Sequence, residues 1–196
     1  MSPMEPKDFP SLAVNWRKLR GVVLFADVCG FFDLARKSPL EDLGTVISQL
    51  YGFWGGEIRR QRGEVVSYIG DSVLALFTAD ACGTMDPEWC ATLAAFHIVK
   101  GMKKIRPDLE ITVGLNSGEI LEGRWDESGR QMQTILGDVV NRAAMLVGGP
   151  ARPKGIHASQ PVVDVLGPRV AREKVTLRVP NNGEEWTIWR LNSLVL

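Results

Sequence analysis

The chain has 196 residues, of which 45% are hydrophobic and 23% are charged, so it can form one hydrophobic core but not two large domains. Its 23 basic and 23 acidic residues give a net charge of +0, so no overall electric field draws it to nucleic acid or to an anionic membrane. The composition therefore favours a small molecule or another protein as the partner.

The first predicted element is a central strand. Residues 1–20 are polar and contain proline, and we expect them to form a loosely held N-terminal arm. Residues 21–28, GVVLFADV, are nearly all apolar, as in a strand that is buried on both faces. Hydrophobic residues at helical spacing then predict a helix that begins after the N-cap Ser38 and ends at Gly63.

A β-hairpin and a second helix follow. Alternating residues over 64–78 flank the pair Gly70-Asp71, which is typical of a two-residue turn. Pro87 stands at the first position of a predicted helix that continues to Ile105, before the next proline. The hairpin therefore has an acidic residue at its tip.

The C-terminal half is predicted to add further strands. Residues 109–125 predict two strands with a turn around Asn116-Ser117-Gly118. The remaining predicted elements are a turn over 126–130, a strand over 131–136, a helix over 138–147, a short helical piece over 159–167, and strands over 174–179 and 184–191 joined by PNNG. This order predicts an α+β sandwich with helices on one face of a largely antiparallel sheet.

Two aspartates stand at the ends of neighbouring elements. Asp27 ends the first strand, just before Gly30, and Asp71 lies at the hairpin tip. Each alone is most simply a cap or turn residue. Together, on adjacent strands, they can place two carboxylates side by side, as divalent metal ions that bridge nucleotide phosphates require.

Three motifs resemble the class III nucleotidyl cyclase catalytic domain, in that family's order and spacing. They are VVLFADVCGF and YIGDSVLALF, which resemble the two metal-site segments, and TILGDVVNRAAML, which resembles the signature strand-to-helix segment. The resemblance covers residues 20–192. It implies a catalytic domain over 21–196 with a ferredoxin-like core, and a head-to-tail homodimer whose substrate sites lie at the interface.

The resemblance also implies a metal site. Asp27 and Asp71 match the family's two metal ligands, and Val28 belongs to the same site. The expected cofactors are two divalent ions, Mn²⁺ or Mg²⁺. One would help to deprotonate the ribose 3′-OH and the other would hold the triphosphate, so that a cyclic nucleotide forms and pyrophosphate leaves.

Further positions match substrate-binding residues of the family. Asn141 matches the asparagine that orients the ribose, and Arg130 matches an arginine that contacts phosphate. Phe31 is expected to line the substrate site. Arg178 is a weaker candidate for a second phosphate-contacting cation, and a solvated surface arginine remains the alternative.

Two positions depart from the family's pattern. Ser67 and Thr134 occupy the base-reading positions, and Ser67 replaces both the lysine expected for adenine and the acid expected for guanine. A site built to hydrogen-bond one base rejects another by roughly 10⁴-fold or more. Met145 stands where the family usually has a transition-state arginine, and Arg142 lies about 100° away around the helix from Asn141.

The departures leave several interpretations open. The favoured one is a pyrimidine cyclase that uses UTP, with CTP possible, like the stand-alone bacterial cyclases of the Pycsar anti-phage system. That system implies a separate effector protein that senses the cyclic nucleotide. The alternatives are a purine cyclase with unusual base recognition and a non-catalytic nucleotide-binding module.

The three cysteines lack metal-ligand spacing and no signal peptide or membrane span is evident, so we expect a cytoplasmic protein.

Overall fold

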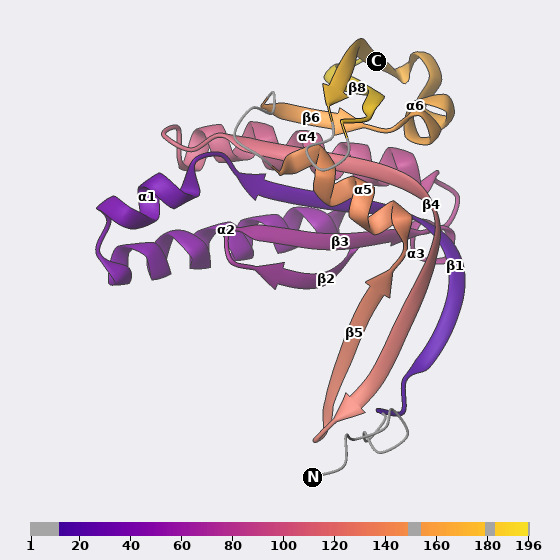
Figure 1. Ribbon diagram of the computed structural model, residues 1–196, viewed down its shortest axis with the longest axis horizontal. Coiled ribbons are helices and arrows are strands. Elements are labelled where there is room, and N and C mark those ends of the chain that lie inside the picture. Colours follow the sequence, from indigo (N-terminus) through magenta and orange to yellow (C-terminus); the bar gives the residue numbers. More distant parts are fainter. Residues whose placement is uncertain (1–11, 149–153, 179–182, 196) are drawn as a thin grey trace.

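The computed structural model describes residues 12–148, 154–178 and 183–195 and contains one eight-stranded sheet (Figure 1). The strands are ordered β2-β3-β1-β4-β6-β8-β7, and β5 pairs with β4 outside this path. Only β4 and β6 run parallel among the described pairs, so the predicted α+β fold with a largely antiparallel sheet is confirmed. The strands are β1 (Asn15–Val28), β2 (Glu64–Ile69), β3 (Ser72–Thr78), β4 (Ile111–Glu127), β5 (Arg130–Leu136), β6 (Gly155–Ala158), β7 (Val170–Arg178) and β8 (Glu185–Leu194).

Helices cover both faces of this sheet. They are α1 (Phe31–Lys37), α2 (Leu40–Arg60), α3 (Ala79–Cys82), α4 (Pro87–Ile105), α5 (Asp138–Val147), α6 (Gln160–Leu166) and the 3₁₀ turn η2 (Gly167–Arg169). The apolar stripe of α2, which includes Leu50, Trp54 and Ile58, packs with α4 against the first face. None of the helices in the described ranges combines the length and apolar composition needed to cross a membrane.

Strand β1 contributes to two hydrophobic clusters. Val22, Leu24 and Ala26 face α2 and α4, whereas Val23 faces the second side of the sheet, since side chains alternate along a strand. Helix α5 packs on that second side, which corrects the prediction that helices occupy one face. A Cβ at Gly114 would lie 2.4 Å from the carbonyl oxygen of Ala143, so only glycine lets α5 approach β4 this closely.

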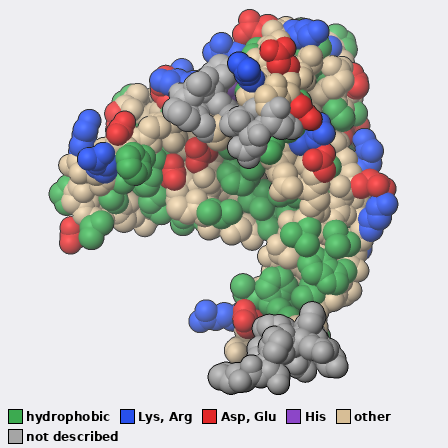
Figure 2. Space-filling view, viewed as in Figure 1, with side chains coloured by type: hydrophobic (Ala, Val, Ile, Leu, Met, Phe, Trp, Pro, Cys, Tyr) green, Lys and Arg blue, Asp and Glu red, His purple; other side chains and the backbone are tan. Residues whose placement is uncertain are grey.

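The paired strands β1 and β4 bend away from the rest of the sheet and carry β5 with them (Figure 1). Figure 2 shows the hollow that this bend leaves, with hydrophobic side chains gathered along it. Ile120 and Ile135 pack here against Leu74 and Leu76 of β3. The second face of the sheet is therefore concave.

Two predicted boundaries are wrong for tertiary reasons. Strand β1 begins at Asn15, so the predicted arm over residues 1–20 ends at least six residues earlier, because Asn15 to Arg20 pair with β4. Asn116-Ser117-Gly118 is not a turn but the middle of the continuous strand β4. Its polar side chains are satisfied internally, since the Asn116 amide donates to the carbonyl oxygen of Val139 at 3.0 Å.

Smaller differences concern caps and short elements. Ser38 is the C-cap of α1, a helix that the pattern did not predict, and Pro39 is the N-cap of α2. Strand β6 was also missed, because four residues are too few for a periodicity signal. Most of the predicted PNNG turn lies outside the described residues, whereas the hairpin at Gly70-Asp71 and the helices α4, α5 and α6 are confirmed.

Candidate active site

The two aspartates meet where β1 ends and β3 begins. The antiparallel register pairs Asp27 with Ser72, so the hairpin-tip residue Asp71 lies beside the end of β1. The Ser72 hydroxyl donates a hydrogen bond to the Asp27 carboxylate. Asp27, Asp71, Val28 and Phe31 line one open pocket with a volume of about 660 Å³. The structure thus brings together four of the residues that the sequence assigned to the site.

Burial raises the pKa of both carboxyl groups. The pKa of Asp27 lies above its usual range because burial disfavours the carboxylate, although the Ser72 hydroxyl partly opposes this. Burial and the charge of Asp27 raise the pKa of Asp71 to about 6, although backbone N–H groups of Asp71 and Val28 donate to its carboxylate. Lys154 lines the same pocket but forms an ion pair with Glu110. The two aspartates therefore repel each other, and no Lys or Arg side chain in the described part of the chain forms an ion pair with either of them.

These residues fit divalent metal ions with oxygen ligands. No group of three or more His, Cys, Asp and Glu side chains gathers in the described part of the chain. Two carboxylates alone provide hard oxygen ligands and leave the other coordination positions to water and substrate phosphates, as Mg²⁺ and Mn²⁺ sites commonly do. The assignment of Asp27, Val28 and Asp71 as metal ligands stays a prediction.

The loop after Asp27 forms the wall of the pocket. Gly30 has a φ of 74°, in the left-handed region, and its carbonyl oxygen accepts the first hydrogen bonds of α1. The N–H of Cys29 donates to the carbonyl oxygen of Glu110 at 2.8 Å, and its sulfur lies 3.1 Å from the Thr112 hydroxyl. Strand β4 thus holds the loop in place.

The other predicted site residues lie elsewhere. Asn141 is exposed on α5, Arg130 is exposed at the start of β5, and Arg178 is exposed at the end of β7. None of these three residues lines the Asp27 pocket. A single chain therefore does not bring them to the two aspartates.

Arg142, the cation next to Asn141 on α5, has partners of its own. The Arg142 guanidinium forms an ion pair with Asp138 at 2.5 Å and lies 4.7 Å from the centre of the Trp186 ring. Met145, four residues after Asn141, is half-buried one turn further along the helix. Arg142 is thus held toward β8 by its own partners.

The two base-reading candidates lie on different strands. A β-bulge between Val65 and Ser67 places Ser67 opposite Leu74, whose side chain belongs to the concave face. The Ser67 hydroxyl makes only a long contact of 3.4 Å with the carbonyl oxygen of Tyr68. Thr134 on β5 pairs with Gly123 of β4, and the described residues contain no hydrogen bond between Ser67 and Thr134.

A model of the adenylate and guanylate cyclase catalytic domain matches residues 19–191. The chain belongs to this family. Residues of this cyclase domain are 28% identical over 125 positions to the uncharacterized protein Rv1319c of Mycobacterium tuberculosis, covering 63% of the chain and 23% of that protein. Rv1318c of the same organism is 28% identical over 146 residues, 72% of the chain and 26% of that protein. The cyclase domain thus spans about a quarter of these curated relatives.

Solved cyclases share the fold of this domain. The adenylyl cyclase CyaB from P. aeruginosa superposes with a TM-score of 0.80 at 20% identity, covering 91% of this chain and 96% of that chain. The guanylate cyclase domain of RhGC from Catenaria anguillulae, in complex with GTP, gives a TM-score of 0.78 at 20% identity and covers 91% and 100%. The family match makes this chain a nucleotidyl cyclase catalytic domain, and the solved structures share its fold.

Three residues of the site escaped the sequence analysis. Ser72 binds the Asp27 carboxylate, Thr112 contacts the loop after it, and Lys154 lines the pocket. Ser72 directly follows Asp71, so the hairpin register alone could have identified it. Thr112 and Lys154 are separated from Asp27 by more than eighty residues and carried no local signal.

Proposed function

We propose that this cyclase domain converts a pyrimidine nucleoside triphosphate, with UTP favoured over CTP, to the 3′,5′-cyclic nucleotide and pyrophosphate. The observation that carries the catalytic part is the pair Asp27 and Asp71, which lie half-buried in one pocket and have raised pKa values. Such a pair is unfavourable unless it binds a cation. A non-catalytic scaffold has no need for it.

Bound Mn²⁺ or Mg²⁺ ions supply Lewis-acid chemistry at the α-phosphate and the ribose 3′-OH. Asp27 and Asp71 would hold these ions, and Ser72 orients the Asp27 carboxylate through its hydrogen bond. The loop between Val28 and Phe31 lines the same pocket, which has room for the triphosphate beside the ions. The resemblance assigns Asn141 to orienting the ribose and Arg130 to contacting phosphate.

We infer a head-to-tail homodimer because the residues of one chain are divided between separate places. Asp27 and Asp71 lie in one pocket, and Asn141, Arg130 and Arg178 lie outside it. A second copy in the family's arrangement supplies these groups to the first copy's metal pocket. The predicted partners are thus the nucleotide and another copy of this chain.

The choice of a pyrimidine depends on Ser67. Its hydroxyl is too short to reach a purine ring nitrogen as a lysine can, and it already lies on the concave face with a long contact to Tyr68. Ser67 and Thr134 can each donate or accept a hydrogen bond, so uracil and cytosine both fit their chemistry. A purine cyclase with unusual base recognition is the second candidate.

The observation that favours the non-catalytic alternative is the lack of a free arginine at the transition-state position. Met145 replaces the usual transition-state arginine, and Arg142 is paired with Asp138. The loss of one such donor costs on the order of 10²–10³ in rate but does not remove catalysis. Arg178 or Arg130 from the second copy is the expected source of positive charge.

Product analysis tests the proposal. Purified protein is incubated with Mn²⁺ and equal amounts of ATP, GTP, CTP and UTP, and the cyclic products are identified by mass spectrometry. We expect cyclic UMP or cyclic CMP as the main product. Ser67→Lys is the matched variant, and we expect it to shift the product ratio toward cyclic AMP by roughly tenfold or more.

Other outcomes separate the candidates. Cyclic AMP or cyclic GMP from the wild type would replace the pyrimidine assignment with the purine one. If no cyclic product forms but nucleotide binds, the module is non-catalytic. Use of the product as an anti-phage messenger, sensed by a separate effector, is a further prediction that requires phage challenge of cells with and without an active Asp71.

A further inference from the structure

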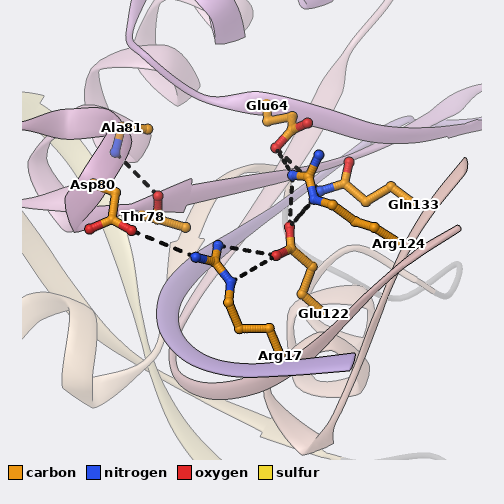
Figure 3. A network of polar contacts seen from close by, with 8 residues as sticks. All are labelled: Arg17, Glu64, Thr78, Asp80, Ala81, Glu122, Arg124 and Gln133. Atoms are coloured by element: carbon orange, nitrogen blue, oxygen red, sulfur yellow. Dashed lines mark hydrogen bonds and ion pairs between the residues drawn. The ribbon is translucent and has the colours of Figure 1, made fainter. Parts of the chain in front are cut away.

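A buried carboxylate lies at the centre of a polar cluster between β1, β2, β4 and β5 (Figure 3). Glu122 on β4 is only 2% exposed. Its carboxylate accepts hydrogen bonds from Arg17 at 3.1 and 3.3 Å and from Arg124 at 3.0 and 2.8 Å. The amide of Gln133 donates a further bond at 2.9 Å. Both oxygen atoms of the Glu122 carboxylate therefore accept hydrogen bonds, one from Arg17 and the other from Arg124 and Gln133.

The cluster joins two strands that share no hydrogen-bonded ladder. Strands β2 and β5 are separated in the sheet by β3, β1 and β4. Glu64 at the start of β2 nevertheless accepts bonds from Arg124 at 2.7 Å and from Gln133 of β5 at 3.2 Å. The bend of the sheet brings these ends together, and the polar cluster connects them.

The same cluster extends to the first turn of α3. Arg17 lies 3.8 Å from the carboxylate of Asp80. The Thr78 hydroxyl caps this helix by accepting a bond from the N–H of Ala81 at 3.3 Å. Both ends of the cluster are therefore attached to the body of the domain, as Figure 3 shows.

A buried ion cluster is a costly way to gain stability. Burial alone raises the pKa of Glu122, but hydrogen bonds from Arg124 and Gln133 and the nearby guanidinium charges outweigh it and hold the pKa below its usual range. Apolar residues of similar volume commonly stabilise a fold as much as such a cluster does. The contribution of the cluster is geometric: bidentate hydrogen bonds from arginine fix the relative positions of the strands that carry the bonded groups.

The strands joined here carry the two base-reading candidates. Gln133 directly precedes Thr134 on β5, and Glu64 lies three residues before Ser67 on β2. The bulge between Val65 and Ser67 lies between the anchored end of β2 and Ser67. A shift of β5 against β2 would therefore move the two candidates relative to each other.

We propose that Glu122 is a positioning residue that holds β5 against β2 and thereby sets the base selectivity of the cyclase. This inference rests on the proposed function, because it assumes that Ser67 and Thr134 read the base. Glu122 touches neither of them and acts through Gln133, Arg124 and Glu64. Misplacement by about 1 Å costs up to 10²-fold in a positioned site.

The experiment compares three full-length variants with the wild type. Glu122→Gln removes the central charge, and Glu64→Ala removes only the link to β2 at an exposed position. Glu119→Ala is the matched control, because Glu119 lies on the same strand and forms an exposed ion pair with Lys18 at 2.9 Å. Glu64→Ala keeps the test valid if Glu122→Gln fails to fold.

Three readouts are measured on each variant. Steady-state kcat and KM for the four nucleoside triphosphates give the base selectivity as a ratio of kcat/KM values. Binding of the four 3′-deoxynucleoside triphosphates, which cannot cyclise, gives the same ratio without chemistry. Hydrogen exchange of the amides of β5 and β2 reports the positions of these strands independently of activity.

Glu122→Gln and Glu64→Ala are expected to narrow the selectivity by roughly ten- to a hundredfold, mainly through KM of the preferred nucleotide, and to speed exchange in β5. Glu119→Ala should match the wild type in all three readouts. Unchanged selectivity in folded Glu64→Ala and Glu122→Gln overturns the inference while the proposed function stands. A wild type that forms no cyclic product contradicts the proposed function instead, and unaltered exchange would then reject the strand coupling separately.

Discussion

Two groups of acidic side chains in this domain have pKa values that are shifted in opposite directions. Asp27 and Asp71 lie close together where β1 ends and β3 begins, neither forms an ion pair with a cationic side chain among the described residues, and the pKa values of both are raised. In the polar cluster on β4, Glu122 is bonded to Arg17 and Arg124, and its pKa is lowered. Burial acts to raise the pKa in both places, so burial alone does not explain the difference.

The partners make the difference. A carboxylate that the fold surrounds with guanidinium groups is satisfied within the chain and serves the structure. A pair of carboxylates that the fold leaves unbalanced is completed only by a cation from outside. The comparison therefore separates the binding site from the structural cluster by charge balance rather than by residue type, and each prediction below tests that separation.

The largest expected effect is on activity. Asp71→Asn should reduce cyclic nucleotide formation by on the order of 10³-fold or more, because it removes a ligand of the metal site. It should leave the metal-free melting temperature unchanged or higher, since one of two repelling charges is gone. Product formation and thermal unfolding measure both. Full activity in this variant would remove Asp71 from the metal site.

The next effect is on stability. Glu122→Gln should lower the free energy of unfolding by about 1.5–3 kcal/mol, because charged hydrogen bonds are lost while the two arginines stay about half exposed to water. Urea unfolding followed by circular dichroism measures this loss. The exposed variant Glu119→Ala serves as the control and should change stability by less than about 1 kcal/mol. A loss for Glu122→Gln no larger than for this control would contradict the structural role of the cluster.

Metal binding should stabilise the folded domain, and this effect should depend on Asp27 and Asp71 but not on Glu122. Mn²⁺ at about 100 times its dissociation constant is expected to add about 2.7 kcal/mol to the unfolding free energy, a rise in Tm of roughly 5–10 °C. The shift should disappear in Asp27→Asn and persist in Glu122→Gln. Differential scanning calorimetry with a chelator as the reference measures it. An equal shift in Asp27→Asn would place the ion elsewhere.

The smallest effects concern pH, and their signs should be opposite. The pKa of Asp71, about 6 when folded, exceeds its ordinary value of 3.8, so the metal-free folded state binds more protons between these values. Its contribution to stability is present below pH 3.8 and is lost as the pH rises through about 6. Glu122 has a folded pKa below 4.5, so its contribution is present above pH 4.5 and is lost on acidification.

The two opposite pH dependences are tested by unfolding curves of the metal-free protein between about pH 3.5 and about pH 7. As the pH rises, the free energy of unfolding of the wild type should fall relative to that of Asp71→Asn. Over the same range, the free energy of unfolding of the wild type should rise relative to that of Glu122→Gln. Parallel curves for the two variants would show that the two groups do not differ in charge balance.

The metal-site half of the molecule could be predicted largely from local patterns. An apolar run that ends in Asp27 and a hairpin tip at Asp71 bring two carboxylates together whenever the two strands pair, and the register of β1 with β3 does so. The turn at Asn116-Ser117-Gly118 failed because a local rule competed with tertiary bonds. Ser117 donates to the buried Glu88 of α4 at 2.6 Å, and Asn116 binds α5, so the segment remains a strand.

The sequence by itself determined the fold class, most of the longer helices and strands, and the hairpin that carries Asp71, because these follow from periodicity and turn chemistry. The motifs that resemble the cyclase family indicated the family, and the base-reading role of Ser67 and Thr134 stays a prediction. Only the tertiary structure decided which acids are balanced. Glu122, Glu64 and Arg17 are separated by up to 105 residues, and nothing local predicts that they meet. The bend of β1 and β4 brings them together, and the charge of a buried group depends on what the fold places beside it.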